Sequence, residues 1–416
     1  MSTLARRGMM RTVAVSVLAL GAHAAVVAAP PTAEVIHWWT SGGESAAIKS
    51  FADEYRAAGG VWHDTAIAGS EQARAVAISR ILGGDPPSAA LFNASKQFLD
   101  LVDQGLLNTV DEVASRQGWD QVLPESILSA VKIHGHYYAA PVDIHMPTWI
   151  WYSKSAFSKA GIAAEPTSFP ELLAALDKLK AAGLIPLAQG GQAWQESVVF
   201  RAVLANVGGR SLYLSVFRDR DPRALRSDAL RNVLLNFKRL KSYVDDGSPG
   251  RNWNDATALL ITGRAGVQIM GDWVKAEFAA AHQVAGRDYG CIAGFGAHSP
   301  YIVQGDVLVF PKTADPDGLR AQQLLARVVT EPRAQVAFSL LKGSIPIRSD
   351  VDGSQLDICA QHGLAILKDR TRQVGNDEIY LTPDQNGALA DLLSEYWNRN
   401  VPLETVQEKF AAALSE

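Results

Sequence analysis

Strand-like and helix-like segments alternate three times between residues 34 and 107, and this alternation limits the fold more than any other feature. The strand-like segments are "EVIHWW", "VWHDTAIAG" and "AALFNA", each followed by apolar residues at helical spacing, such as Phe51 and Tyr55. A βαβαβα order predicts an α/β fold in which a parallel sheet has helical crossovers. Ligands of such sheets bind beyond the carboxyl ends of the strands. Trp38, Trp39 and Asn93 stand at such ends.

The chain then leaves this unit and returns to it. In "VKIHGHYYAAPVDIH" Gly135 predicts a hairpin turn, and "PTWIWYSKSAFSKAG" begins a second unit with long helical stretches over 166–290. The strand pattern comes back in "YIVQGDVLVFP". A length of 416 residues suits two lobes better than one. We predict an N-terminal lobe of residues 30–145 and 304–345, and a C-terminal lobe of residues 146–303 and 349–416.

Residues 1–29 have the pattern of a secretory signal peptide. Arg6, Arg7 and Arg11 precede the apolar run "VAVSVLALGA", and small residues follow it. Cleavage after Ala24 or after Ala29 fits equally well, and a buried N-terminal helix is the alternative. We therefore expect export to the periplasm. The formal net charge of −4 excludes the basic footprint of a nucleic-acid binder.

The chain has two cysteines, Cys291 and Cys359. An even number of cysteines in an exported chain favours a disulfide bond. Two buried free thiols are the alternative. A bridge across 68 positions would add roughly 4 kcal/mol to the free energy of unfolding through chain entropy.

Enzyme signatures are missing from the sequence. It has no GxSxG, HExxH, Walker A, GxGxxG or CxxC motif, so it predicts no catalytic residue and no cofactor. His134 and His136 flank the hairpin glycine, where solvated histidines are more common than metal ligands, so we predict no metal site. An exported carbohydrate-active enzyme stays as an alternative because one sequence cannot show whether two carboxylates face each other.

Aromatic residues are the stronger signal. Among the ten tryptophans, Trp38, Trp39, Trp194 and Trp273 fall at chain turns. A sugar ring presents C–H bonds on its faces and hydroxyls at its rim, so it suits an indole platform beside charged groups. Trp38 or Trp39 together with Glu44 supplies both within one turn. Core filling is the alternative explanation for any one of these tryptophans.

Several motifs together resemble the family 1 extracellular solute-binding proteins of ABC sugar importers. They are "HWWTSGGE", "YYAAPVDIHMPTWIWY", "PLAQGGQAWQE", "VQIMGDWVKAEF" and "LLKGSIPIRSD". The chain is most similar to the glucose/mannose-type branch of Gram-negative periplasms, from about residue 34 onward. That family also places cysteines near "DYGC" and "DICAQ", where Cys291 and Cys359 stand.

The resemblance implies a type II periplasmic binding protein fold with hinge strands near 145, 304 and 348. It implies a monomer that binds a small carbohydrate and docks on the permease subunits of an ABC transporter. A receptor that signals instead of transporting is a further alternative. The implied ligand contacts are Trp38, Trp39, Glu44, Asn93, His145, Trp194, Asp272, Trp273, Asp306, Lys342 and Glu378.

The chain departs from the glucose type at two places. Asn93 stands where glucose-binding members often carry a lysine, and "GNDEIYLTPD" has Asp377, Glu378 and Tyr380 where those members carry a histidine. The site therefore loses cationic donors and gains an acid. This argues against glucose itself and favours a different monosaccharide, a polyol or an amino sugar.

Overall fold

A computed structural model describes residues 29–296 and 299–415. The predicted signal peptide lies outside the described residues, apart from residue 29. Residues 31–416 form one compact unit. Among the described residues, no helix combines the length and the apolar character that a bilayer span requires.

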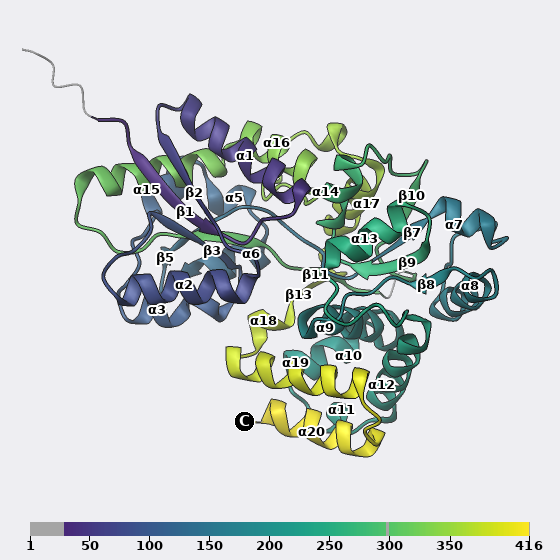
Figure 1. The fold of residues 1–416 in the computed structure, drawn as a ribbon. Coiled ribbons are helices and arrows are strands. Elements are labelled where there is room, and N and C mark those ends of the chain that lie inside the picture. The colour runs from purple at the N-terminus through teal and green to yellow at the C-terminus, as the bar shows by residue number, and fades with distance from the viewer. Residues whose placement is uncertain (1–28, 297–298, 416) are drawn as a thin grey trace, which may run out of the picture. The chain divides into compact units, whose positions relative to one another are not determined.

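The first sheet has five strands in the order β2-β1-β3-β12-β6. Figure 1 shows its strands β1, β2 and β3 side by side. Strand β1 pairs in parallel with both β2 and β3, while β12 runs antiparallel to β3 and β6. The predicted βαβαβα unit is therefore confirmed. Its strands and helices are β1 (Thr32–His37), α1 (Gly42–Ala57), β2 (Val61–Ala66), α2 (Ser70–Leu82), β3 (Ala89–Asn93) and α3 (Leu99–Asp103), and the sheet is completed by β6 (Ala139–Pro141) and β12 (Asp306–Val309).

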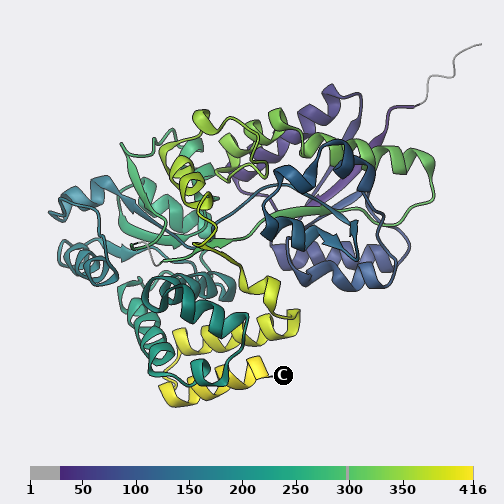
Figure 2. The same ribbon diagram turned by 180° about the vertical axis from the view of Figure 1, so that it is seen from behind.

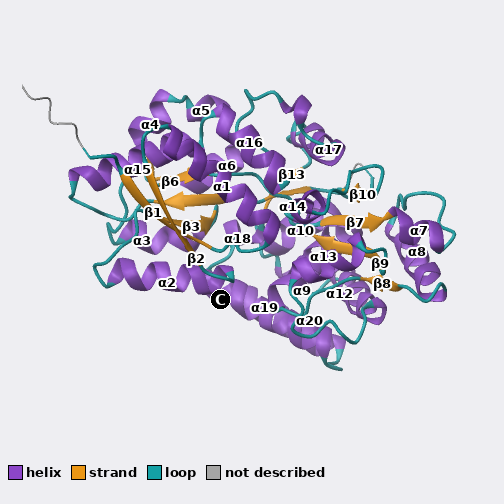
Figure 3. Cartoon of the chain, turned by 45° about the horizontal axis from the view of Figure 1, so that its top comes forward, coloured by secondary structure: helices purple, strands orange, loops and turns teal. Residues whose placement is uncertain are grey.

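Helices cover both faces of this sheet (Figure 3). Helix α1 begins where the Ser41 side chain accepts a hydrogen bond from the Glu44 backbone N–H, and it buries Phe51 and Tyr55 at helical spacing. The other helices of this lobe, with its small hairpin, are α4 (Asp111–Arg116), α5 (Trp119–Val122), α6 (Glu125–Val131), β4 (Lys132–Ile133), β5 (His136–Tyr137), α15 (Pro316–Val329) and α16 (Pro332–Lys342). The predicted turn at Gly135 is confirmed, since β4 and β5 pair antiparallel and Gly135 has a φ of 86°.

The second sheet has four strands in the order β10-β7-β9-β8 and is separate from the first. Its strand β7 is buried along its whole length, as the continuous apolar run "WIWYS" requires. The elements of this lobe are β7 (Trp149–Ser153), α7 (Lys154–Lys159), α8 (Phe169–Ala181), β8 (Ile185–Leu187), α9 (Ala193–Val203), α10 (Gly209–Phe217), α11 (Pro222–Leu225), α12 (Asp228–Leu240), α13 (Trp253–Ile261), β9 (Ala265–Met270), α14 (Val274–Ala280) and β10 (Tyr289–Ile292).

Within the described chain, three segments connect the two lobes, near residues 145, 304 and 345, and they are hydrogen-bonded to one another. The backbone N–H of His145 donates to Gln304 at 2.7 Å, and that of Gln304 donates back at 2.9 Å. Ile144 and Ile345 exchange two further bonds of 2.9 Å. Beyond them, β11 (Tyr301–Val303) pairs in parallel with β13 (Gln373–Gly375).

The last two helices pack on the second lobe, as the view from behind also shows (Figure 2). Helix α19 contacts α9, and α20 contacts α12. The helices of the C-terminal segment are α17 (Ile358–Leu367), α18 (Asp377–Tyr380), which contacts residues 96–98 of the first lobe, α19 (Pro383–Asn398) and α20 (Leu403–Ser415). The predicted disulfide is confirmed: Cys291 of β10 is bonded to Cys359 of α17.

Packing is continuous between the lobes on one side. The core of the first lobe extends into the second through Trp151, Val274 and Phe278. At this junction Gly43 of α1 lies so close to α14 that a Cβ there would stand 2.5 Å from Ala276, and the Gly43 N–H donates to Glu277 Oε1 at 3.1 Å. No residue with a side chain fits at this position without movement.

Candidate ligand-binding site

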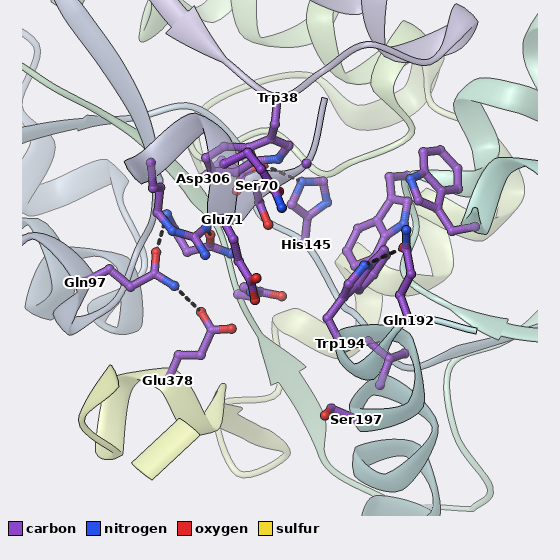
Figure 4. Close-up of a pocket in the computed structure, with 18 of the residues that line it drawn as sticks. Trp38, Ser70, Glu71, Gln97, His145, Gln192, Trp194, Ser197, Asp306 and Glu378 are labelled. Carbon is purple, nitrogen blue, oxygen red and sulfur yellow. Dashed lines mark hydrogen bonds and ion pairs between the residues drawn. The ribbon is translucent and has the colours of Figure 1, made fainter. Parts of the chain in front are cut away.

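A cavity of about 850 Å³ opens where the ends of β1 and β3 face the second lobe. Figure 4 shows Gln97 and Glu378 at one end of this cavity, Trp194 and Gln192 at the other, and Trp38, Asp306 and His145 between them. The lining residues come from both lobes and from α18 and α19. The carboxyl ends of β1 and β3 therefore border the cavity, as expected for a ligand site of a parallel sheet.

The adjacent tryptophans at the end of β1 separate. Trp38 is half-buried and lines the cavity, with the guanidinium carbon of Arg74 5.6 Å from its ring centroid. Trp39 is only 1% exposed and packs on Phe338 with ring centroids 5.3 Å apart. The Lys342 ammonium lies 5.3 Å from the Trp39 ring centroid. Trp39 is therefore mainly a core residue that reaches the cavity, and Trp38 is the better aromatic platform.

Aromatic rings also gather on the wall that the second lobe contributes. Trp194 and Trp273 lie with ring centroids 6.3 Å apart, and Trp253, at the start of α13, lines the same cavity. The Trp273 ring folds back over Gly271, where a Cβ would stand 2.1 Å from the indole. This glycine lets the Trp273 ring lie against the backbone that carries it.

A buried histidine joins three carboxylates at the connecting segments. His145 Nδ1 lies 2.5 Å from Asp272 Oδ1, and Nε2 lies 2.9 Å from Asp143 and 3.2 Å from Asp306. Burial by itself lowers the pKa of His145, but the charges of Asp143 and Asp272 outweigh it and raise that pKa well above its usual range. The imidazole is therefore a cation that holds the carboxylates together.

The same cluster has the spacing of a metal site. One ligand atom each from Asp143, His145 and Asp306 lies within 4.8 Å of the others. A protonated imidazole has no free lone pair for a metal ion. The residues present therefore fit an ion-pair network better than a metal centre.

A second buried pair lies beside it. Lys342 Nζ donates to Glu44 Oε1 at 2.9 Å, and both side chains are buried. Burial lowers the pKa of Lys342, but Glu44, Asp143 and Asp306 together raise it above its ordinary value. Burial and the neighbouring Asp143 raise the pKa of Asp306, although His145 opposes them. The result is a compact set of paired charges at the base of the cavity.

The end of the cavity at Gln97 and Glu378, called the far end below, differs from this base, whose His145 and Asp306 lie between the two ends (Figure 4). Arg74 Nη1 donates to Asn93 Oδ1 at 3.2 Å, and Gln97 Nε2 donates to Glu378 Oε2 at 3.4 Å. Burial lowers the pKa of Arg74, and burial raises the pKa of Glu378. Behind Glu378, Arg201 forms an ion pair with Asp377 at 2.6 Å.

The structure brings the residues predicted as ligand contacts together, with one exception. Asp272 does not line the cavity, because its carboxylate oxygens face His145 Nδ1 and the Met146 N–H. His145 does line the cavity, but both of its ring nitrogens face carboxylates. The others that line it are Trp38, Trp39, Glu44, Asn93, Trp194, Trp273, Asp306, Lys342 and Glu378.

Sequence reasoning missed Arg74, Arg201 and Trp253, which also line the cavity. Arg74 lies in the first turns of α2, and its helical pattern is that of an ordinary surface arginine. Its position could have been found from the fold, because the first turn of a helix that follows a parallel strand lies at the ligand edge of the sheet.

A family model described as bacterial extracellular solute-binding protein matches residues 39–335. The chain belongs to this family. The solute-binding proteins related to it include a "Probable sugar-binding periplasmic protein" from Rhizobium meliloti (strain 1021), 39% identical over 363 residues, or 87% of this chain and 86% of the relative. A protein of the same description from Brucella suis biovar 1 (strain 1330) is 35% identical over 100% of this chain and 99% of its own.

Solved solute-binding proteins share the fold. The bacterial solute receptor AcbH, described with an exclusive preference for β-D-galactopyranose, superposes with a TM-score of 0.76 at 20% identity, covering 92% of this chain and 97% of its own. This likeness confirms the predicted α/β fold, the two-lobe type II binding protein fold. The family and these relatives are binding receptors, so this solute-binding protein is not an enzyme.

Proposed function

We propose that this protein is a periplasmic receptor that captures a monosaccharide between its lobes and delivers it to the permease of an ABC importer. A polyol or an amino sugar is the nearest alternative ligand. One observation carries the proposal: a single cavity combines Trp38 and Trp273, from opposite lobes, with the hydrogen-bonding groups of Glu44, Asp306 and Lys342. The names of the curated relatives support a sugar and a periplasmic location.

The chemistry of the lining suits a sugar ring. Indole faces at Trp38 and Trp273 offer apolar surface to the C–H face of the ring, and carboxylates accept hydrogen bonds from its hydroxyls. An analogue that lacks one hydroxyl would lose one hydrogen bond to a charged group, at a cost of about 1.5 to 3 kcal/mol in binding free energy. Selectivity follows from that cost.

Binding is coupled to closure of the lobes in this proposal. The ligand contacts both walls at once, so it binds the closed form better and shifts the population toward it. The connecting segments near 145, 304 and 348 would absorb the motion. The predicted lobe boundaries, the monomeric state and docking on permease subunits belong to the same proposal.

A thermal-shift screen over monosaccharides, polyols and amino sugars tests the function, with titration calorimetry on each compound that raises the melting temperature. We expect a sugar to bind and to be recovered unchanged after hours of incubation. The variant Trp273→Ala should lose about 1.5 to 3 kcal/mol of binding free energy without unfolding. Unchanged affinity in this variant would remove Trp273 from the site, and failure of every compound would overturn the proposed function.

A further inference from the structure

The charged residues that line the cavity fall into two classes. Glu44 is paired with Lys342, His145 with Asp306, and Arg201 with Asp377. Among the described charged residues of the lining that are at least half-buried, Arg74 and Glu378 have no ion-pair partner within 4 Å. These two side chains therefore differ from the other buried charges of the described lining, which are held in ion pairs.

Both side chains have hydrogen-bonding capacity to spare. A guanidinium carries five N–H donors, and Arg74 uses one of them on Asn93 among the described residues. A carboxylate accepts about four hydrogen bonds, and Glu378 accepts a long one of 3.4 Å from Gln97. Partly buried donors and acceptors that lack a hydrogen bond are unfavourable in free energy. A ligand that bonds to Arg74 and Glu378 removes this unfavourable contribution.

Arg74 places a cation at the carboxyl end of β3. Its guanidinium donates to the Asn93 amide oxygen at 3.2 Å, and Asn93 is the last residue of that strand. One face of the Trp38 ring lies against the same guanidinium. The cation is therefore held in place on the first lobe by packing rather than by a carboxylate.

Glu378 faces Arg74 from the other wall of the cavity. It is the second residue of α18, and the positive charges of Arg201 and Arg74 and the negative charges of Asp377 and Asp306 all act on it. Glu71 and Asp306 act on Arg74 as well. Around this end of the cavity, each charge is therefore close to an opposite charge, although Arg74 and Glu378 do not touch.

We propose that Arg74 and Glu378 select an uncharged carbohydrate, with Arg74 donating to a ligand oxygen and Glu378 accepting from a ligand hydroxyl. Hydroxyl groups both donate and accept, so adjacent hydroxyls satisfy both side chains. An ammonium group gains from Glu378 but is repelled by Arg74, and a carboxylate gains from Arg74 but is repelled by Glu378. This inference rests on the proposed function and narrows its ligand class.

The test uses matched sugars that differ only in charge. Glucose, glucosamine and glucuronate form one set, and the galacto and manno sets are built in the same way. Each is titrated by calorimetry into the full mature protein and into Glu378→Gln and Arg74→Gln. The controls are Glu125→Gln and Arg116→Gln, which remove one exposed charge each outside the cavity.

We expect the neutral member of one set to bind best to the unchanged protein. Glu378→Gln should shift the preference toward the acidic member by about tenfold, and Arg74→Gln should shift it toward the amino member by about as much. The controls should leave the order of preference unchanged. Circular dichroism and the melting temperature verify that each variant is folded.

Preference of the unchanged protein for an amino or acidic sugar would overturn this inference and leave the proposed function standing. The same holds if both folded variants keep the original preference, because other residues would then set it. If neither a member of any set nor any compound of the thermal-shift screen binds, the proposed function itself fails.

Discussion

The base and the far end of the cavity differ in how their charges are satisfied. At the base, His145, Asp306, Lys342 and Glu44 are buried and paired with one another. At the far end, Arg74 and Glu378 are half-buried and have hydrogen bonds to neutral amides alone among the described residues. The paired charges of the base therefore also stabilise the fold, whereas Arg74 and Glu378 keep more hydrogen-bonding capacity for a ligand.

The tryptophan pair gives the largest expected effect. Trp39→Ala should lower the free energy of unfolding by about 3 to 5 kcal/mol, because it removes a buried indole that packs on Phe338. Trp38→Ala should lower it by clearly less, since Trp38 is half-buried. Urea unfolding of both variants measures the difference, and equal losses would contradict the division of the pair between core and cavity.

The buried histidine should be nearly as important for stability. His145→Gln leaves three carboxylates without their shared cation, and we expect a loss of about 3 to 5 kcal/mol at pH 6. Because the folded-state pKa of His145 is raised, its contribution is complete below the unfolded value of about 6.5 and is lost as the pH rises through the raised pKa.

Thermal unfolding from about pH 6 to pH 10 measures this dependence. The gap in melting temperature between the unchanged protein and His145→Gln should narrow as the pH rises. The control is His136→Gln, whose exposed side chain pairs with Asp111, and its melting temperature should stay close to that of the unchanged protein. A gap that does not depend on pH would show that His145 stabilises by packing alone.

The Lys342–Glu44 pair should show a coupling of about 1 to 3 kcal/mol in a double-mutant cycle. Lys342→Met alone leaves a buried carboxylate without its partner, and adding Glu44→Gln should restore part of the lost stability. Urea unfolding of the two single variants and the double variant gives the coupling. If the losses of unfolding free energy in the two single variants simply add up in the double variant, Lys342 and Glu44 do not stabilise each other.

Glu378→Gln should have the smallest effect on stability. Burial raises the pKa of Glu378. A carboxyl group whose pKa is higher in the folded state makes the protein less stable as the pH rises through that pKa. The charge of Glu378 therefore contributes no stability at neutral pH. We expect the free energy of unfolding to change by no more than about 1 kcal/mol at pH 7. If Glu378→Gln lowers the free energy of unfolding as much as His145→Gln does, Glu378 stabilises the fold in the same way as the buried base of the cavity.

Local patterns were enough to predict much of the fold. The parallel unit of β1, β2 and β3 follows from the order of strands and helices, and the Cys291–Cys359 bridge is expected from an even cysteine count in a chain with a predicted signal peptide. The alternation of side chains along an extended segment also predicts that adjacent tryptophans face different ways. It does not predict which of Trp38 and Trp39 enters the core, because that depends on α16, some 300 residues later.

The pairing inside the cavity could not be predicted in the same way. Asp272 has the motif of a ligand contact, yet it faces His145, which is 127 positions away in the sequence. Arg74 has no motif at all, and its role depends on the position of Asn93 on the neighbouring strand. Each of these contacts, Asp272 with His145 and Arg74 with Asn93, joins residues of different structural elements. Such contacts form only in the folded protein, so a local sequence pattern does not predict them.

The close approach of Gly43 to Ala276 has a mechanical consequence. Helices that meet across a glycine have little room to slide or separate, so this edge would act as a fulcrum in the lobe closure proposed above. A rotation about a fulcrum moves distant points farthest. A larger residue in place of Gly43 would push α1 and α14 apart and favour the open form of the protein. The affinity for the ligand would then fall, although Gly43 does not touch it.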